Sequence, residues 1–306
     1  MNSSIPMDRF YDYLIKNVIS VFYGLIINYI NGTFVLVFFK NTIFYSDPRY
    51  ILYTHLVIND MIMLSISVCL QVTVHVVGIF NLTLCCVVLL FATIVSKNSP
   101  LNLACMAIER YIAICKPLHH TQICTVSRTY MLIWFLWTLS AVPAFTDIFI
   151  TLSARPASFF STSVVCHGMF IHNTWEHTVN NTVSDVMYLT FVWTTLIVTY
   201  YKVLSAAKAA STDRVSARKA RNTILLHGGQ LLLCMMTYVT PFISTSLINL
   251  FPESRSTILF TLYLLTNILP RLLSPLIYGL RDKQFAERIK VYFCCKQIKT
   301  QIIPVK

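Results

Sequence analysis

Long apolar stretches separated by short polar ones run along nearly the whole of this 306-residue chain. About 20 consecutive, mostly apolar residues are enough for a helix to cross a lipid bilayer. The sequence contains seven such stretches, at residues 18–40, 51–75, 83–108, 129–150, 183–204, 222–246 and 257–280. The loops between them are short, so the pattern predicts an all-α membrane protein with one seven-transmembrane helix bundle over residues 18–280.

The two ends of the chain differ in pattern. Residues 1–17 are mixed and charged, and we expect them to form an extracellular N-terminus. The first apolar stretch is too long for the core of a signal peptide, so we expect it to insert without a cleavable leader. Residues 281–306 form a cytoplasmic tail, and its segment Gln284–Phe293 is amphipathic, which predicts a short eighth helix.

Composition and charge placement orient this bundle. Hydrophobic residues make up 56% of the chain and charged ones 12%, which is about half the charge of a soluble domain. Seventeen of the 24 lysines and arginines lie in or beside the odd-numbered loops and in the tail, and four lie on the opposite side. Positive residues stay on the cytoplasmic side, so the N-terminus is expected outside, with the protein in the plasma membrane. The net charge of +12 reflects this orientation, and no nucleic-acid partner is expected.

Three cysteines lie on the predicted outer side. Cys85 and Cys86 open the stretch 83–108, and Cys166 lies in the long loop 151–182. An oxidising compartment permits a disulfide between that loop and the helix. The positions alone leave open whether Cys85 or Cys86 forms it.

Two further sites suit covalent modification. Asn2 begins an Asn-Ser-Ser sequence, an acceptor pattern for glycosylation on the outer side. Cys294 and Cys295 follow the amphipathic segment, where adjacent cysteines suit palmitoylation. Plain buried thiols are the alternative for this pair.

Charged residues stand at the inner end of the third stretch. Glu109, Arg110 and Tyr111 are followed by Lys116 and Pro117, and the proline should end the helix. A charged side chain within the membrane costs free energy and usually belongs to a functional site. The nearby His119 and His120 lack other metal ligands at useful spacing, so we expect loop residues that touch a partner.

Short sequence motifs occur in a fixed order along the chain. Each motif alone is weak evidence for a protein family, but the whole series is specific. They are Asn31-Gly32, Asp60, Glu109-Arg110-Tyr111, Trp134, Pro143, Tyr200-Tyr201, Lys208 to Thr212, Pro241-Phe242 and Pro270 to Lys283. This series resembles odorant receptors, a branch of the rhodopsin-like receptors coupled to G proteins, and it looks most like those of fish. Ser274 and Val239 depart from the usual pattern, as in a divergent member.

The resemblance implies a disulfide between Cys85 and Cys166. It also implies a switch in which the Arg110 side chain pairs with Glu109 in a closed bundle and turns to a heterotrimeric G protein when the bundle opens. Further members of this switch are expected from the same resemblance. They are Tyr111, Tyr201, Tyr278 and Pro275. Interfacial anchoring of the arginine and tyrosines is the alternative.

A second polar group lies in mid-membrane. It comprises Asn31, Asp60, Arg271 and Ser274. We hypothesise an ion pair between Asp60 and Arg271 in place of the sodium ion that related receptors often hold. The alternative is a protonated Asp60 hydrogen-bonded to Asn31.

Lys97 and Asp185 fall in the outer half of the bundle, where receptors of this kind bind ligands. They could neutralise each other or bind a charged, small ligand. Further candidates for lining the pocket are Ala92, Thr93, Ser96, Phe191 and Tyr263. Amine receptors carry an aspartate where Ala92 stands, and opsins a retinal-binding lysine where Ile268 stands, so neither a monoamine nor retinal is supported.

The sequence therefore predicts an odorant receptor that binds a small, polar or charged odorant within the bundle and activates a heterotrimeric G protein. One alternative is a non-olfactory chemosensory or orphan rhodopsin-like receptor. Another is a transporter or channel whose pathway is lined by buried charges, although internal repeats are absent. Nucleotide-binding and hydrolytic motifs are missing, so no enzyme and no cofactor are expected.

Overall fold

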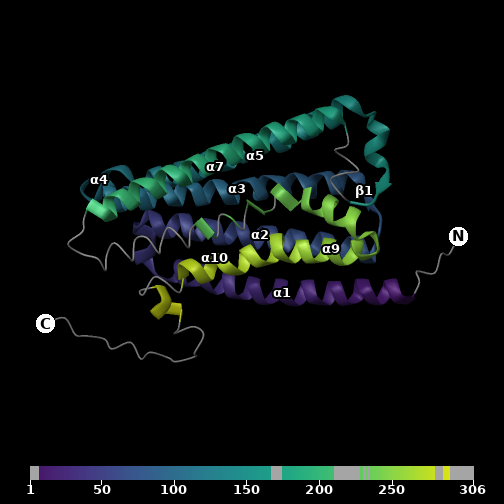
Figure 1. Ribbon diagram of the computed structural model, residues 1–306, viewed down its shortest axis with the longest axis horizontal. Coiled ribbons are helices and arrows are strands. Elements are labelled where there is room, and N and C mark those ends of the chain that lie inside the picture. The colour runs from purple at the N-terminus through teal and green to yellow at the C-terminus, as the bar shows by residue number, and fades with distance from the viewer. Residues whose placement is uncertain are drawn as a thin grey trace.

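The protein is a bundle of long helices in a computed structural model (Figure 1). The described residues are 7–166, 174–209, 228–229, 232, 235–236, 238–240, 242–279 and 285–289. The long helices lie side by side along the longest axis of the molecule. Helix α3 is in the middle, in contact with α2, α5 and α7, while α1 packs on α2.

Helices account for most of the described residues. The long ones are α1 (Met7–Lys40), α2 (Pro48–Val76), α3 (Leu82–Cys115), α5 (Val126–Ala154), α7 (Trp175–Ala209), α9 (Arg255–Tyr263) and α10 (Leu269–Gly279). The short ones are α4 (Pro117–Ile123), η1 (Thr42–Ser46), η2 (Ala157–Ser161), η3 (Pro252–Ser254) and the π-helical turn η4 (Leu264–Ile268). The strands β1 (Phe80–Asn81) and β2 (Ser163–Val164) pair antiparallel. The all-α prediction is confirmed.

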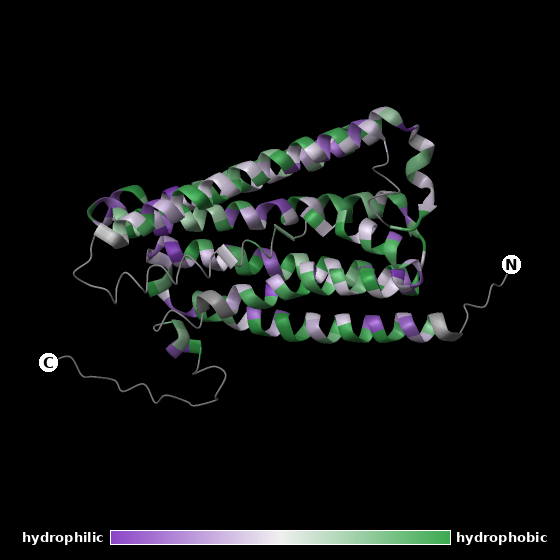
Figure 2. Ribbon diagram, in the orientation of Figure 1, coloured by the Kyte–Doolittle hydropathy of each residue, from purple (hydrophilic) through white to green (hydrophobic). Residues whose placement is uncertain are grey.

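Six helical segments in the described part of the chain are long and apolar enough to cross a membrane. They are Phe10–Lys40, Pro48–Val76, Leu82–Cys115, Val126–Ala154, Trp175–Ala206 and Pro252–Pro275. These segments coincide with six of the seven apolar stretches. The remaining stretch, 222–246, lies partly outside the described residues, and its described positions are helical. Figure 2 shows apolar residues along the whole length of the long helices, as lipid contact requires.

Helix α1 begins at Met7, well before residue 18, where the first span was expected to start. The Lys16 ammonium lies 2.6 Å from Asp12 Oδ2 one turn away, and it donates to Ser256 Oγ at 2.6 Å. An ion pair at this spacing supports a helix. The extra turns therefore tie the start of α1 to α9.

The predicted eighth helix is seen in its described part, residues 285–289, which are helical. Phe285 and Ile289 are buried, whereas Glu287 and Arg288 are exposed, as one apolar face of a helix requires. The Phe285 ring packs 5.0 Å from the Phe44 ring and 5.9 Å from the Tyr50 ring, between centroids. This short helix is thus anchored to η1 and α2.

At Pro143, Pro270 and Pro275, inside the spans, a side chain serves the carbonyl that proline leaves without its usual helical donor. Pro143 cannot donate to the Leu139 carbonyl, and the Tyr188 hydroxyl donates there at 2.7 Å. Pro275 cannot donate to the Arg271 carbonyl, which instead accepts from the Asn31 amide at 3.5 Å. These contacts join α5 to α7 and α10 to α1.

Candidate functional site

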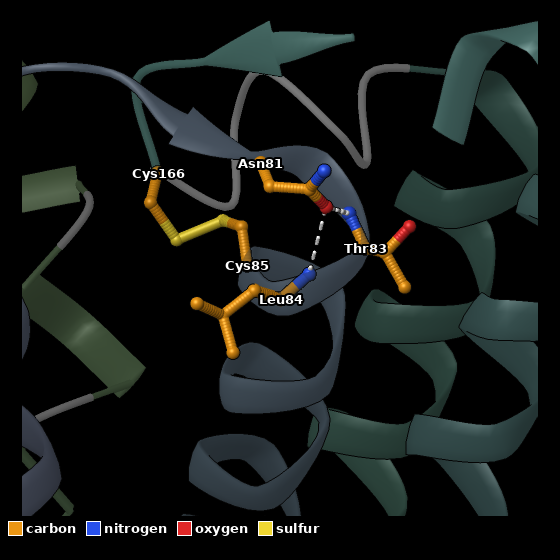
Figure 3. The surroundings of a disulfide bond; sticks show 5 residues. All are labelled: Asn81, Thr83, Leu84, Cys85 and Cys166. Carbon is orange, nitrogen blue, oxygen red and sulfur yellow. Dashed lines mark hydrogen bonds between the residues drawn. A yellow bond between two sulfur atoms is a disulfide. The ribbon is translucent and has the colours of Figure 1, made fainter. Parts of the chain in front are cut away.

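The predicted outer end of α3 is fixed by covalent and hydrogen-bonded contacts (Figure 3). Asn81 precedes the helix, and its Oδ1 accepts from the main-chain N–H groups of Thr83 at 3.0 Å and Leu84 at 3.4 Å. Such a cap satisfies donors that the first turn leaves without partners. One turn further, Cys85 forms a disulfide with Cys166 across a Cα–Cα distance of 5.5 Å. The pairing implied by the resemblance is confirmed, and Cys86 is a free thiol.

The predicted inner end of α3 carries a group of side-chain contacts. The helix ends at Cys115, and Pro117 begins α4, because the residue before a proline avoids the helical conformation. Glu109 is 5% exposed, and its carboxylate lies 3.5 Å from Arg110 Nε. The same carboxylate lies 3.0 Å from His120 Nε2 of α4. The expected pair of Glu109 and Arg110 is therefore present with a third member.

Contacts around α4 hold His120 in that position. Arg128 Nη1 donates to the carbonyls of Gln122 at 2.8 Å and Ile123 at 3.2 Å, at the end of the short helix. The charged guanidinium thus satisfies terminal carbonyls. Sequence reasoning placed His120 in a loop and missed this contact, because α4 was not predicted.

The other residues predicted to belong to the switch have different surroundings. Tyr111 is half-buried, whereas Tyr201 is 66% exposed on α7. The Pro275 carbonyl accepts from the Tyr53 hydroxyl at 3.4 Å, which joins α10 to α2. The side chain of Tyr278 lies outside the described part of the structure, as do Asn2, Cys294 and Cys295.

The polar group in mid-membrane is buried, but Asp60 and Arg271 form no salt bridge within the described structure. Arg271 Nη1 donates to the Thr266 carbonyl at 2.5 Å. Pro270 cannot supply that carbonyl with its helical N–H, so the guanidinium takes the place of the missing donor. Arg271 still acts on the Asp60 carboxylate electrostatically, without direct contact.

Neighbouring side chains complete this group. Ser99 Oγ lies 3.3 Å from Asp60 Oδ1 and accepts from the Asn59 amide at 2.7 Å. Ser274 Oγ donates to the Pro270 carbonyl at 3.1 Å. The amide of Asn31 donates to the main chain of α10 rather than to Asp60. The group therefore connects α1, α2, α3 and α10 through hydrogen bonds.

Lys97 of α3 and Asp185 of α7 form a direct salt bridge in the outer half of the bundle. The Lys97 side chain is 8% exposed and that of Asp185 is 35% exposed. The ammonium also lies 5.7 Å and 5.0 Å from the ring centroids of Tyr188 and Tyr238, within the range of cation–π attraction. The first of the two roles considered for these residues, mutual neutralisation, is thus present in this structure.

Sequence reasoning missed a second polar cluster, between α5 and α7. Asp147 Oδ1 lies 3.0 Å from His177 Nδ1 and accepts from the Asn180 amide at 2.8 Å. His177 Nε2 lies 3.2 Å from Thr151 Oγ1. Asp147 is the only acidic residue in the stretch 129–150, and an acid at membrane depth is itself a signal of function. That signal was available in the sequence.

A small cavity adjoins this cluster, between α3, α5 and η2. Thr93 lines it, whereas the other candidates for the ligand pocket are not among the residues around it. Those candidates are Ala92, Ser96, Phe191 and Tyr263. Ala92, Ser96 and Tyr263 are half-buried, and Phe191 is exposed.

The fourth span also differs from the expectation in its tryptophans. Trp134 is 73% exposed. Trp137 faces the bundle instead, and its indole Nε1 donates to His55 Nε2 of α2 at 2.9 Å. An indole N–H that is buried needs an acceptor, so Trp137 is the residue that joins the two helices.

Comparison with known proteins identifies the class. The family described as 7 transmembrane receptor (rhodopsin family) matches residues 30–278, and the chain belongs to this family. Odorant receptor 131-2 of zebrafish (Danio rerio) is 30% identical over 278 residues, which cover 90% of this chain and 85% of the relative. Human olfactory receptor 51D1 is 24% identical, with 81% and 77% covered. Human olfactory receptor 52I2 is 27% identical, with 80% and 72% covered. The predicted seven-transmembrane receptor class and the resemblance to odorant receptors are confirmed.

Proposed function

We propose that this chain is an odorant receptor of the plasma membrane that binds a small extracellular ligand and activates a heterotrimeric G protein. The observation that carries the proposal is the closed contact of Glu109, Arg110 and His120 at one end of α3, opposite the end held by the disulfide. Family membership and the odorant-receptor relatives support it. They also favour a receptor over a transporter or channel.

The orientation follows from chemistry at the two ends. A disulfide persists in an oxidising environment outside the cell, and Cys85 lies at the end of α3 that carries it. The basic residues of the loops and tail favour the opposite end as cytoplasmic. Residues 1–17 are then extracellular, and residues 281–306 are cytoplasmic beyond the bundle of residues 18–280.

The proposed switch has two states, which differ in the contacts of the Glu109 carboxylate. In the closed state the carboxylate holds both Arg110 and His120. Opening of the bundle separates these groups and frees the arginine for the G protein, with Tyr201 and Tyr278 as hydroxyls that stabilise the open state. Ligand and G protein both favour that open state, so each raises the affinity of the other.

The ligand is proposed to bind in the outer halves of the helices, near Lys97 and Asp185. Because the two charges of this salt bridge neutralise each other, the pair joins α3 to α7 at one side of the proposed ligand site. A polar ligand contacts the exposed part of Asp185. Asn2 is proposed as a glycosylation site, and Cys294 and Cys295 as palmitoylation sites.

The test is cAMP signalling in transfected cells exposed to pooled odorants. Arg110→Ala should abolish the response at equal surface expression. The matched control is Arg155→Ala, at the outer end of α5, which should leave coupling intact. A response that survives Arg110→Ala, or ion flux without any G protein, would contradict the proposal.

A further inference from the structure

A cavity of about 40 Å³ lies between the outer parts of α3 and α5. Thr93 and Cys86 of α3, Asp147 and Thr151 of α5, and Phe160 of η2 are among the residues that line it. One water needs about 10–15 Å³ by this measure. The space therefore holds a few waters or the polar head of a small molecule.

The loop over this cavity is fixed in place. The Phe160 carbonyl of η2 accepts from Thr83 Oγ1 of α3 at 2.9 Å. Beyond η2, the strand β2 pairs with β1, and the disulfide from Cys85 joins the same loop to the helix. The roof and the walls thus come from elements tied to one another, which preserves the shape of the site.

When His177 is neutral, the groups that donate hydrogen bonds to the Asp147 carboxylate in the described structure are uncharged. Asp147 is 2% exposed, and its Oδ1 is bound by His177 and Asn180 at the distances given above. A buried carboxylate is normally paired with a positive charge. Lys97 acts on Asp147 from a distance, but its ammonium is engaged by Asp185.

Two hydroxyl groups add acceptors to the same wall. Thr93 Oγ1 donates to the Leu89 carbonyl at 2.9 Å, and Thr151 Oγ1 donates to the Asp147 carbonyl at 2.8 Å. Each hydroxyl has one hydrogen to give. The Thr93 oxygen therefore presents lone pairs to its surroundings, which favours a group that donates hydrogen bonds, whereas the Thr151 oxygen is also in contact with His177 Nε2 at 3.2 Å.

We propose that this cavity binds the primary ammonium group of a small amine, with Asp147 as its counter-ion. When His177 is neutral, Lys97 is one cation beside the two carboxylates of Asp147 and Asp185, and an ammonium supplies the missing positive charge together with three donors. The site lies on α5, away from the position of Ala92. The inference deepens the proposed function by naming a ligand class, and its signalling consequence rests on that function.

Binding is tested first without any G protein, on the purified full-length receptor. The probes are methyl-, ethyl-, propyl- and butylammonium, compared with the alcohols and carboxylates of matching length near neutral pH. We expect the short amines to raise the thermal unfolding midpoint and the alcohols and carboxylates to leave it unchanged, since a ligand that binds only the folded state stabilises it. Asp147→Asn should weaken amine binding on the order of tenfold to a hundredfold, because a charge-assisted bond is lost.

A second pair of variants guards against misfolding of Asp147→Asn. Thr93→Leu fills the cavity without removing the acid and should abolish the amine effect. Its matched control is Thr146→Leu: Thr146 makes the same kind of bond to the preceding turn, at 2.9 Å, but is half-buried and is not among the residues that line the cavity. Equal amine binding by these two variants would overturn the inference.

The remaining outcomes are also decisive. Alcohols as effective as amines, or amine binding unaffected by Asp147→Asn, would contradict the ammonium site. Stabilisation by acid that depends on Asp147, with no added effect of amines, would assign the missing charge to a proton on His177 and overturn the proposal. In the cAMP assay, Asp147→Asn should shift responses to amines and spare those to neutral odorants. If amines shift the thermal unfolding midpoint but no odorant produces a cAMP response, the ammonium site would be supported and the proposed function would be wrong.

Discussion

The two ends of α3 are held in different ways. At the outer end a disulfide, a strand pair and the Asn81 cap fix the helix to the loop above it. At the inner end Glu109 meets Arg110 and His120 through contacts that rearrange without breaking a covalent bond. The proposed function requires such a division, with a fixed end for the proposed ligand site and an end whose contacts rearrange for the proposed switch.

The largest expected effect comes from breaking the outer end. The Cys85–Cys166 bridge joins residues 81 apart in sequence, and a loop of that length is stabilised by about 4–5 kcal/mol in the chain-entropy account. Cys85→Ser should therefore lose most surface expression and lower the thermal unfolding midpoint of the purified receptor. Cys86→Ser is the matched control and should change little. Equal losses in the two variants would mean that the bridge contributes no more than a buried thiol.

A second prediction concerns how the short helix of residues 285–289 is anchored to η1 and α2. Phe285 is 1% exposed among the rings of Phe44 and Tyr50. Replacing a buried phenylalanine with alanine costs about 3–5 kcal/mol. Phe285→Ala should reduce surface expression strongly, whereas Phe149→Ala, at an exposed position on α5, should not. If both variants express like the wild type, the packing of Phe285 against η1 and α2 contributes little to stability.

The sequence could predict the parts that depend on local pattern. Apolar length predicts the spans, Lys116 and Pro117 predict the end of α3, and the position of Cys85 with the family resemblance predicts the disulfide. The spans and the end of α3 depend on neighbouring residues, whereas the choice of Cys85 for the disulfide comes from the resemblance. Six of the spans and the bridge are therefore recovered from the chain alone.

Contacts between distant helices could not be predicted in the same way. Arg271 was expected to pair with Asp60, but Pro270 leaves the Thr266 carbonyl without a helical donor, and the guanidinium serves that carbonyl. The meeting of Asp147 with His177 depends on how α5 and α7 rotate against each other. Sequence could only have marked Asp147 as an acid at membrane depth.

A third prediction concerns the charge pair between the two ends. Removing one partner of a buried ion pair costs about 3–5 kcal/mol, and we expect less for Lys97 and Asp185 because the aspartate side chain is 35% exposed. Asp185→Ala should lower the unfolding midpoint, and the double exchange Lys97→Asp with Asp185→Lys should restore part of it. A double variant worse than the sum of the single ones would show that the surrounding rings of Tyr188 and Tyr238 require the cation on α3.

The smallest effect is expected at His120, which contacts the Glu109 carboxylate. His120 contributes one of the two contacts to the Glu109 carboxylate, so its loss should weaken the closed state by about 0.5–1.5 kcal/mol. His120→Ala should then raise ligand-independent cAMP signalling by roughly twofold to tenfold at equal surface expression. His119→Ala is the matched control, because His119 lies on the same short helix but is exposed, and it should leave basal signalling unchanged. Lower basal signalling in His120→Ala would mean the reverse relation, in which His120 competes with Arg110 for Glu109 and its removal tightens the remaining pair.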